Sequence, residues 1–208
     1  MYGVELIAHR AGNGRELIAP ARAVADGIEI DVHTFRGRFE VRHSKALWPF
    51  AVYWERRVGL LPDEKPPSLA SILDATPADT HLWVDLKGFT GRFTKRVLHE
   101  LGDRRPLTMS CRSWWALGPA RRRRDVRTFR SIGNRLQLWI ALRIRHPDGV
   151  GVHERFATVE HLERLRDRCT GVAVWAVNDL DRAIELRDRG VAVLIIDDLG
   201  LIDAICAA

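Results

Sequence analysis

Two acidic residues, Glu29 and Asp31, alternate with aliphatic residues in the segment 27–32. Side chains of a strand point alternately to its two faces, so the two carboxylates share one face and the aliphatic residues share the other. Two buried like charges are costly unless a cation neutralises them, and a hard divalent cation takes oxygen ligands. The spacing therefore favours a cation site. Two carboxylates paired with arginine on an edge strand would give the same pattern.

A second segment, 82–87, repeats this alternation, with Asp85 and Lys87 on one face and aliphatic residues on the other. Asp85 would add a third carboxylate at the same end of the fold. Only four of the 33 basic residues are lysine, so a lysine at a strand end suggests a point charge, for example toward phosphate. An ordinary Asp–Lys surface pair is the alternative.

Two histidines stand at the ends of predicted strands: His9 directly follows residues 4–8, and His43 is the last residue of a second, short strand predicted at 38–43. An imidazole titrates near neutral pH and can transfer a proton to a leaving alkoxide. Each histidine alone fits a structural role. Together, beside three carboxylates, they indicate an acid/base pair for cleavage of a P–O bond.

Strand and helix patterns alternate along the chain and must position these side chains. Residues rich in Val and Ile predict strands at 4–8, 28–32, 82–86, 107–109, 126–129, 150–153, 172–177 and 191–196. Helices are predicted between and after them, at 19–25, 68–75, 91–101, 114–124, 134–145, 158–168, 181–189 and 199–206, with Thr158 and Asp179 or Asp181 as N-caps. Eight strand–helix units predict an α/β fold, a compact (β/α)8 TIM barrel. An open doubly wound sheet is the alternative, but no GxGxxG follows the first strand.

Residues 44–67 interrupt this alternation with four prolines and no clear period. We interpret them as a short elaborated loop after the second strand, inserted into a single domain of residues 1–208. Such loops carry the active sites of barrel enzymes.

Composition excludes several classes of protein. The 208 residues are 46% hydrophobic, enough for one core, and no apolar run approaches the roughly 20 residues of a membrane-spanning helix. With no leader pattern at the start, we expect a cytoplasmic protein. The three cysteines are too far apart for a zinc motif, and we expect core thiols. The net charge of +6 is spread among 27 acids, with one block at 121–124, so we expect no nucleic-acid partner.

Six segments, in this order, resemble the glycerophosphodiester phosphodiesterases: Ala-His-Arg-Ala at 8–11, Glu-Ile-Asp-Val at 29–32, Val-Arg-His at 41–43, Pro-Ser-Leu-Ala-Ser-Ile-Leu at 67–73, Val-Asp-Leu-Lys at 84–87 and Val-Trp-Ala-Val-Asn at 174–178. The resemblance covers nearly the whole chain and implies the same barrel. It also implies a divalent cation, Mg²⁺ or Ca²⁺, on Glu29, Asp31 and Asp85. His9 and His43 would be the acid/base pair, Arg10 and Lys87 would contact phosphate, and Trp175 would line the substrate pocket.

The sequence departs from the family pattern around these positions. The Pro-Glu-Asn-Thr element that usually follows the first His-Arg is replaced by Arg-Glu-Leu-Ile at 15–18, which keeps the glutamate and loses the asparagine. Only 20 positions separate His9 from Glu29. The third acidic ligand is the shorter Asp85, and Ser44 stands where an aspartate usually follows the second histidine.

The expected function is metal-dependent hydrolysis of a small glycerophosphodiester to an alcohol and glycerol phosphate. The nucleophile, water or a hydroxyl of the substrate, is not decided by the sequence, nor is the oligomeric state. A second interpretation is a lysophospholipase D or sphingomyelinase D type of activity, with a lipid or membrane contact through the apolar segment 46–54. A third is a catalytically silent barrel that binds a phosphorylated ligand or a partner protein.

Overall fold

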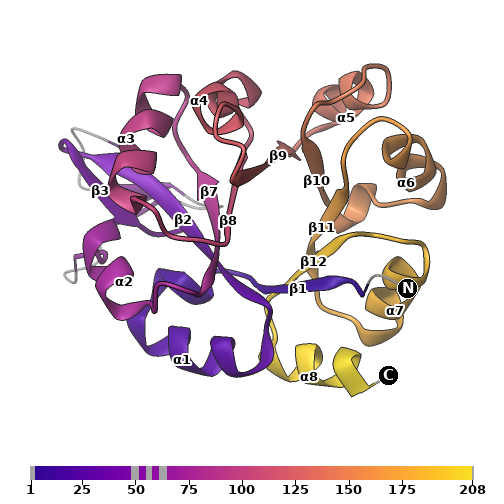
Figure 1. Ribbon diagram of the computed structural model, residues 1–208, viewed down its shortest axis with the longest axis horizontal. Coiled ribbons are helices and arrows are strands. Elements are labelled where there is room, and N and C mark those ends of the chain that lie inside the picture. The colour runs from indigo at the N-terminus through magenta and orange to yellow at the C-terminus, as the bar shows by residue number, and fades with distance from the viewer. Residues whose placement is uncertain (1–2, 48–51, 55–57, 61–64, 208) are drawn as a thin grey trace.

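The computed structural model, which describes residues 3–47, 52–54, 58–60 and 65–207, contains a closed parallel β-barrel surrounded by helices (Figure 1). Pairing runs in the order β1, β12, β11, β10, β9, β8, β7, β2, and β1 also pairs with β2, which closes the barrel. The barrel strands are β1 (Glu5–Ala8), β2 (Gly27–Phe35), β7 (His81–Leu86), β8 (Leu107–Cys111), β9 (Val126–Ile132), β10 (Gly149–His153), β11 (Val172–Val177) and β12 (Val193–Ile196). The predicted (β/α)8 barrel is confirmed.

Helices follow the strands and cover the outside of the barrel. They are α1 (Arg15–Val24), α2 (Leu69–Ala75), α3 (Gly91–Leu101), α4 (Gly118–Arg121), α5 (Arg135–Ala141), α6 (Val159–Arg166), α7 (Leu180–Asp188) and α8 (Leu199–Ala207), with the 3-10 helices η1 (Ala11–Asn13), η2 (Trp114–Leu117) and η3 (Glu154–Phe156). The predicted caps Thr158 and Asp179 each accept a hydrogen bond from a backbone N–H of the first turn. No helix in the described part of the chain combines the length and apolar character needed to cross a membrane.

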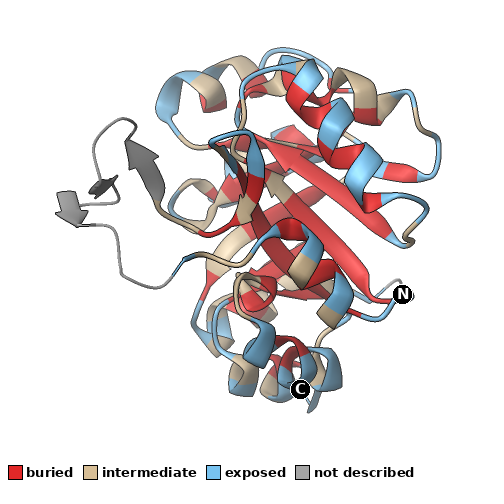
Figure 2. Ribbon diagram, turned by 90° about the vertical axis from the view of Figure 1, so that its left-hand side faces the viewer, coloured by how far each residue is buried: buried red, intermediate tan, exposed pale blue. Residues whose placement is uncertain are grey.

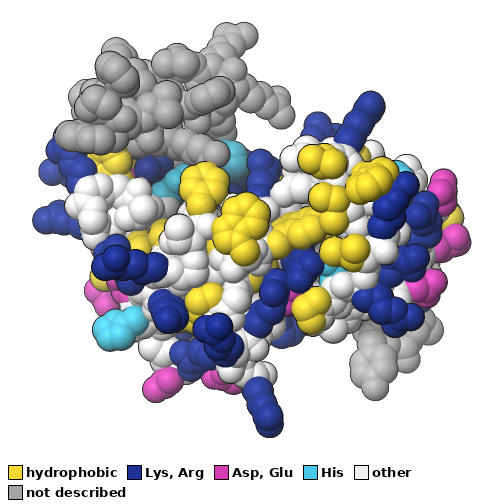
Figure 3. All heavy atoms as spheres, turned by 90° about the horizontal axis from the view of Figure 1, so that it is seen from above, with side chains coloured by type: hydrophobic (Ala, Val, Ile, Leu, Met, Phe, Trp, Pro, Cys, Tyr) yellow, Lys and Arg dark blue, Asp and Glu magenta, His cyan; other side chains and the backbone are white. Residues whose placement is uncertain are grey.

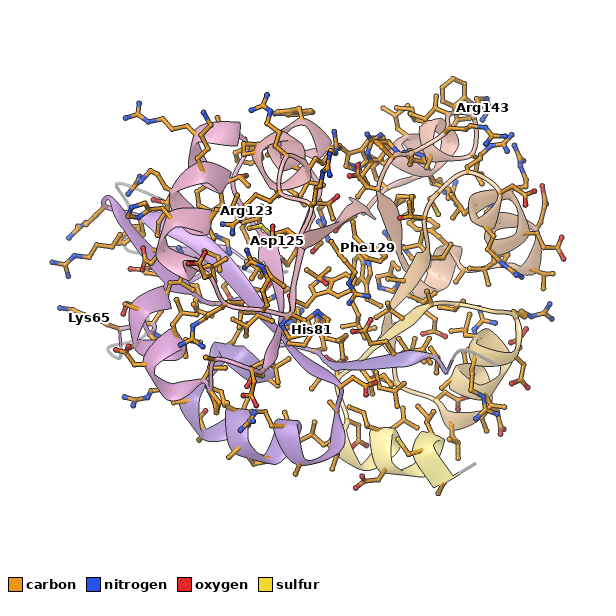
Figure 4. The ribbon with its side chains drawn as sticks, viewed as in Figure 1. Lys65, His81, Arg123, Asp125, Phe129 and Arg143 are labelled. Atoms are coloured by element: carbon orange, nitrogen blue, oxygen red, sulfur yellow. The ribbon has the colours of Figure 1, made fainter. Side chains whose placement is uncertain are left out.

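Apolar side chains fill two layers, one between strands and helices and one inside the barrel. Figure 2 shows the strands as almost entirely buried. Ile28, Ile30 and Val32 of β2 belong to the outer layer, as their alternation with the acidic residues predicts. The inner layer is smaller and contains Ile7, Trp83, Phe129, Ala173, Val193 and Ile195. Figure 4 shows the labelled Phe129 near the middle of the ring.

A polar network lies at the amino-terminal ends of the strands. Glu5 Oε1 lies 2.8 Å from His81 Nδ1, and Arg127 Nη2 donates to both Glu5 oxygens at 2.9 and 2.8 Å. Arg127 Nε also donates to Thr108 Oγ1 at 3.1 Å. Burial alone would raise the pKa of Glu5, but His81 and Arg127 hold that pKa below its usual range.

The short strand predicted at 38–43 is present, and the described part of 44–67 contains more regular structure than the sequence indicates. β3 (Arg38–Val41) pairs antiparallel with β2, and β4 (Lys45–Leu47), β5 (Val52–Trp54) and β6 (Val58–Leu60) form a separate antiparallel sheet. Strands of three residues are too short to show a period, so the pattern predicted only a loop. Part of the apolar segment 46–54 lies outside the described residues.

Other differences concern element ends and one cysteine. α1 begins at Arg15 rather than at Ala19, with Pro20 inside it, because the buried side chain of Ile18 stabilises an extra first turn. The helix expected over 114–124 is divided into η2 and α4. Cys206 is exposed on α8, so the expectation of three core thiols is wrong for this residue.

Candidate metal and phosphate site

Three carboxylates meet at the carboxyl ends of β2 and β7. Asp31 and Asp85 are register partners in the parallel ladder, and Glu29 lies two residues before Asp31 on the same inward face. One oxygen from each of the three lies within 4.8 Å of the others. Glu29 and Asp31 are only 2% and 1% exposed. The alternation in the sequence therefore produces a compact, buried cluster of oxygen donors.

The cluster places three acidic side chains close together, and two of them are buried. Burial, and then the charge of Asp31, raise the pKa of Glu29 well above its usual value. Burial also disfavours charge on Asp31, but the Lys87 ammonium and hydrogen bonds from His43, Lys87 and Asn13 hold its pKa below its usual range. An additional cation would relieve this repulsion.

Lys87 is the cation that the protein itself supplies to the cluster. Its Nζ lies 2.5 Å from Asp31 Oδ1 and also contacts Asp85 Oδ2. Burial alone would lower the pKa of Lys87, but Asp85, Asp31 and Glu29 raise it. Lys87 therefore remains an ammonium group that bridges two carboxylates. Asp85 and Lys87 therefore lie together inside the barrel mouth, as the alternation predicts, and the alternative of an ordinary surface pair does not hold.

The short connection after β1 holds two of the carboxylates. Asn13 Nδ2 donates to Asp31 Oδ2 at 2.8 Å, and Asn13 Oδ1 accepts from the backbone N–H of Asp31 at 2.9 Å. The backbone N–H of Arg10, a residue with φ of 56°, donates to Glu29 Oε2 at 2.8 Å. A Cβ on Gly12 would come within 2.1 Å of Ile30 Cγ2, so this close approach requires glycine.

Asn13 is a site residue that the sequence analysis missed. The family-like element at 15–18 lacks an asparagine, but Asn13, two residues before it, hydrogen-bonds Asp31. The signal available was an amide residue between two glycines directly after the first His-Arg.

The two predicted histidines lie on either side of the carboxylates. His43 Nδ1 lies 3.2 Å from Asp31 Oδ2, and Arg10 Nη2 donates to His43 Nε2 at 2.8 Å. Since arginine can only donate, His43 Nε2 is the acceptor and Nδ1 carries the proton. His9 Nε2 is 4.0 Å from Glu29 Oε2.

The opposite nitrogen of His9 contacts a residue that the sequence analysis also missed. His9 Nδ1 donates to Asp197 Oδ1 at 2.5 Å, and Asn178 Nδ2 donates to Asp197 Oδ2 at 2.9 Å. These hydrogen bonds, led by that from His9, lower the pKa of Asp197 to about 2. Its position directly after β12 was the available signal, because acidic residues at strand ends also marked the other carboxylates.

A cavity joins most of these groups. Its lining includes His9, Arg10, Glu29, His43, Trp83, Asp85, Lys87, Ser110, Arg112, Ser131, Gly151, Trp175 and Ile195. Two buried donor atoms, Arg10 Nε and Trp175 Nε1, have no hydrogen-bond partner among the described residues. Ser110 Oγ donates to Asp85 Oδ1 at 2.7 Å, which fixes that carboxylate. Unpaired donors beside a carboxylate cluster fit an anionic ligand that also binds a cation.

The structure thus brings all eight predicted site residues together. The donor set of the cluster is entirely carboxylate oxygen, which suits a hard divalent cation, and the cluster could hold one. In the protein alone, the Lys87 ammonium contacts two of these carboxylates, Asp31 and Asp85.

Comparisons with known proteins agree with this geometry at the level of the fold. No protein-family model matches the sequence, and no curated protein matches it. Solved structures of glycerophosphodiester phosphodiesterases are similar over the whole chain, at low sequence identity. The Thermotoga maritima enzyme has a TM-score of 0.75 and 20% identity, with 99% of each chain covered. The Parabacteroides distasonis enzyme has a TM-score of 0.70 and 18% identity, with 99% of this chain and 97% of that chain covered.

A third similar structure holds a small phosphate ester. It is an Oleispira antarctica phosphodiesterase in complex with the product sn-glycerol-3-phosphate, with a TM-score of 0.73 and 17% identity. The alignment covers 100% of this chain and 98% of that one. At these identities the comparisons establish the shared fold.

Proposed function

We propose that this protein is a metal-dependent phosphodiesterase that hydrolyses a small glycerophosphodiester to an alcohol and glycerol phosphate. The observation that carries the proposal is one cavity lined by two histidines and by two carboxylates of the buried three-carboxylate cluster. Two donor atoms of the same lining have no hydrogen-bond partner among the described residues. Cation ligands, acid/base groups and anion-binding groups are the three sets that this reaction needs. The similar fold of known glycerophosphodiester phosphodiesterases supports the same reaction class.

Glu29, Asp31 and Asp85 would hold the cation, Mg²⁺ or Ca²⁺. When bound, the cation supplies a positive field for a non-bridging phosphate oxygen and for the charge that develops there. Arg10 and Lys87 add positive charge to the same region. Arg10 Nε lies 3.9 Å from Asp31 Oδ2 and has no hydrogen-bond partner among the described residues. Trp175 forms one wall of the cavity, with its ring 4.7 Å from that of His153.

The two histidines differ in what holds them. Asp197 fixes the Nδ1 proton of His9 and leaves Nε2 toward the cavity. His43 is held between Arg10 and Asp31. One histidine protonates the leaving alcohol and the other activates the nucleophile. That nucleophile is water or a neighbouring hydroxyl of the substrate, and the second would give a cyclic phosphate.

The test is a hydrolysis assay with glycerophosphocholine, glycerophosphoethanolamine and bis(p-nitrophenyl) phosphate, in Mg²⁺, Ca²⁺ or chelator. We expect hydrolysis that needs a divalent cation and that Asp85→Asn abolishes. Phosphorus NMR of the products separates glycerol phosphate from a cyclic phosphate. If no combination of metal and substrate gives turnover while phosphate esters still bind, the result would favour a catalytically silent barrel that binds a phosphorylated ligand.

The lipid-directed reaction remains the second candidate, and one observation favours it. Phe89 and Trp115, two large apolar side chains at the carboxyl-terminal rim of the barrel, are exposed. Turnover of lysophosphatidylcholine in preference to glycerophosphocholine would support this substrate class.

A further inference from the structure

Four large apolar side chains are exposed on one sector of the barrel rim. The exposed fractions are 64% for Phe89, 72% for Trp115, 66% for Leu136 and 53% for Trp139. Phe89 follows β7, Trp115 lies in η2 after β8, and the other two lie in α5 after β9. We call these four residues the apolar rim. Single exposed apolar residues are ordinary, but four on adjacent connections mark an interaction surface.

Hydrogen bonds fix these connections to one another. Trp115 Nε1 donates to the carbonyl oxygen of Phe89 at 2.6 Å. Gln137 in α5 donates from Nε2 to the carbonyl oxygen of Arg112 at 3.0 Å and accepts from the Gly133 N–H at 2.9 Å. The apolar rim is therefore a preformed surface.

Arginines accompany the apolar rim. Arg92, Arg112 and Arg135 are exposed in the same three connections, and none forms an ion pair with a described residue. The Arg143 guanidinium lies 4.0 Å from the centre of the Trp139 ring. Residues 87–145, which contain all of this surface, hold 16 basic and three acidic residues.

Figure 3 faces the side of the molecule that carries α3, α4 and α5 in Figure 1. On this side, hydrophobic side chains gather between Lys and Arg side chains, and acidic side chains lie mainly toward the margins.

We propose that the apolar rim docks this protein on the surface of an anionic lipid bilayer. Trp and Phe side chains are favoured at the headgroup level, and unpaired arginines are attracted to lipid phosphates. Leu136 and Phe89 would enter the acyl boundary, where an apolar side chain gains most. A nucleic acid would satisfy the arginines but would leave these two side chains against charged backbone. A second copy meeting the same face would bring unpaired arginines together.

Docking in this orientation brings the catalytic cavity to the lipid surface. The rim and the carboxylates share the carboxyl-terminal end of the barrel, and Arg112 belongs to both the rim sector and the cavity lining. That docking would favour substrates held at a lipid surface rests on the proposed function. Docking itself needs no hydrolysis, so the two proposals can fail separately.

The experiment is co-sedimentation of the whole chain with vesicles of phosphatidylcholine, alone or mixed with phosphatidylglycerol. We expect binding that requires phosphatidylglycerol. Phe89→Ala/Trp115→Ala/Leu136→Ala should lower the partition coefficient about tenfold or more. The matched control is Leu17→Ala in α1, which removes an exposed apolar side chain outside residues 87–145 and should bind like wild type. Unchanged circular dichroism and melting temperature establish that the triple variant is folded.

A second pair of variants tests the role of the rim arginines. Both variants lose two arginines, so their net charges are equal to each other. Arg92→Gln/Arg135→Gln should weaken binding about fivefold for each arginine, whereas Arg122→Gln/Arg124→Gln, in exposed residues near the end of α4, should weaken it much less. Absence of binding to phosphatidylglycerol vesicles would overturn the proposal, as would equal losses in the control variants. Two further results would overturn the proposal if vesicles are not bound. One is a dimer of the wild type that the triple variant dissociates, and the other is binding of duplex DNA.

Discussion

His9 and Asp197 are 188 positions apart in the sequence, yet His9 Nδ1 donates a hydrogen bond to Asp197 Oδ1 at 2.5 Å. The contact joins the ends of two neighbouring strands, because β12, the last strand of the chain, pairs with β1, the first. Asp197 therefore holds one ring orientation of His9, with Nε2 on the side of Glu29. The last strand of the chain thus positions a candidate acid/base group at the end of the first.

Replacing Asp197 by Asn should lower kcat on an alkyl diester by about tenfold or more with little change in KM. The carboxylate holds the ring of His9 in one orientation, and proton transfer by a correctly placed group contributes about 10²–10⁴ to rate. Asp197→Glu should restore part of the rate. An unchanged kcat in the folded Asp197→Asn variant would show that this residue does not position His9 for the reaction.

Divalent cations should stabilise the folded protein. Binding to the native state alone, at a concentration of about 100 times Kd, adds about 2.7 kcal/mol, which corresponds to about 5–10 °C in melting temperature. Chelator should remove this increase. The control is Glu29→Gln, which should abolish the response to metal without destabilising the metal-free protein, because burial and the charge of Asp31, which raise the pKa of Glu29, disfavour a charged group there. Equal melting temperatures of the wild type with and without cation would contradict the metal site.

Lys87 should weaken cation binding while it assists the reaction. Its ammonium contacts Asp31 and Asp85, so it competes with a cation for two of the three carboxylates. Lys87→Gln should therefore tighten Mg²⁺ or Ca²⁺ binding by about tenfold or more, since a positive charge at this distance costs a cation several kcal/mol. The same variant should lower kcat/KM. Isothermal titration calorimetry measures the first effect, and weaker cation binding in the variant would show that Lys87 supports the site.

The parts of the site that could be predicted from the sequence are those encoded by local alternation. Glu29, Asp31 and Asp85 are inward because β2 and β7 have a two-residue period, and the register of the two strands brings them together. Asn13 and Asp197 were missed because their contacts depend on tertiary packing rather than on spacing: Asn13 reaches β2 from the connection after β1, and Asp197 reaches His9 from the end of β12. The strands β4 to β6 were missed because three residues show no period.

Glu5 should stabilise the base of the barrel at neutral pH. Hydrogen bonds and charge from His81 and Arg127 hold its folded-state pKa below the unfolded value of 4.5. The stabilisation is therefore present above about pH 4.5 and is lost as the pH falls through the folded-state pKa. Glu5→Gln should cost about 1–3 kcal/mol at pH 7, and the difference from wild type should shrink below pH 4.5. Urea unfolding at several pH values measures this, with the exposed Glu100→Gln as control. A difference independent of pH would show that the charge of Glu5 is not what stabilises the base.

The acid and base roles of His9 and His43 should be distinguishable by comparing substrates with poor and good leaving groups. Each histidine-to-alanine variant should lower kcat on glycerophosphocholine by on the order of 100-fold or more, because each transfers a proton. p-Nitrophenolate needs little protonation to leave, so loss of the general acid should largely spare hydrolysis of bis(p-nitrophenyl) phosphate. Loss of the group that activates the nucleophile should slow both substrates. Because His43 Nε2 accepts a hydrogen bond from Arg10, we assign the base to His43 and the acid to His9, and we expect His9→Ala to be the variant that spares the activated substrate. If His43→Ala spares it instead, the two roles are exchanged, and if neither variant lowers kcat on glycerophosphocholine, these histidines are not the acid/base pair.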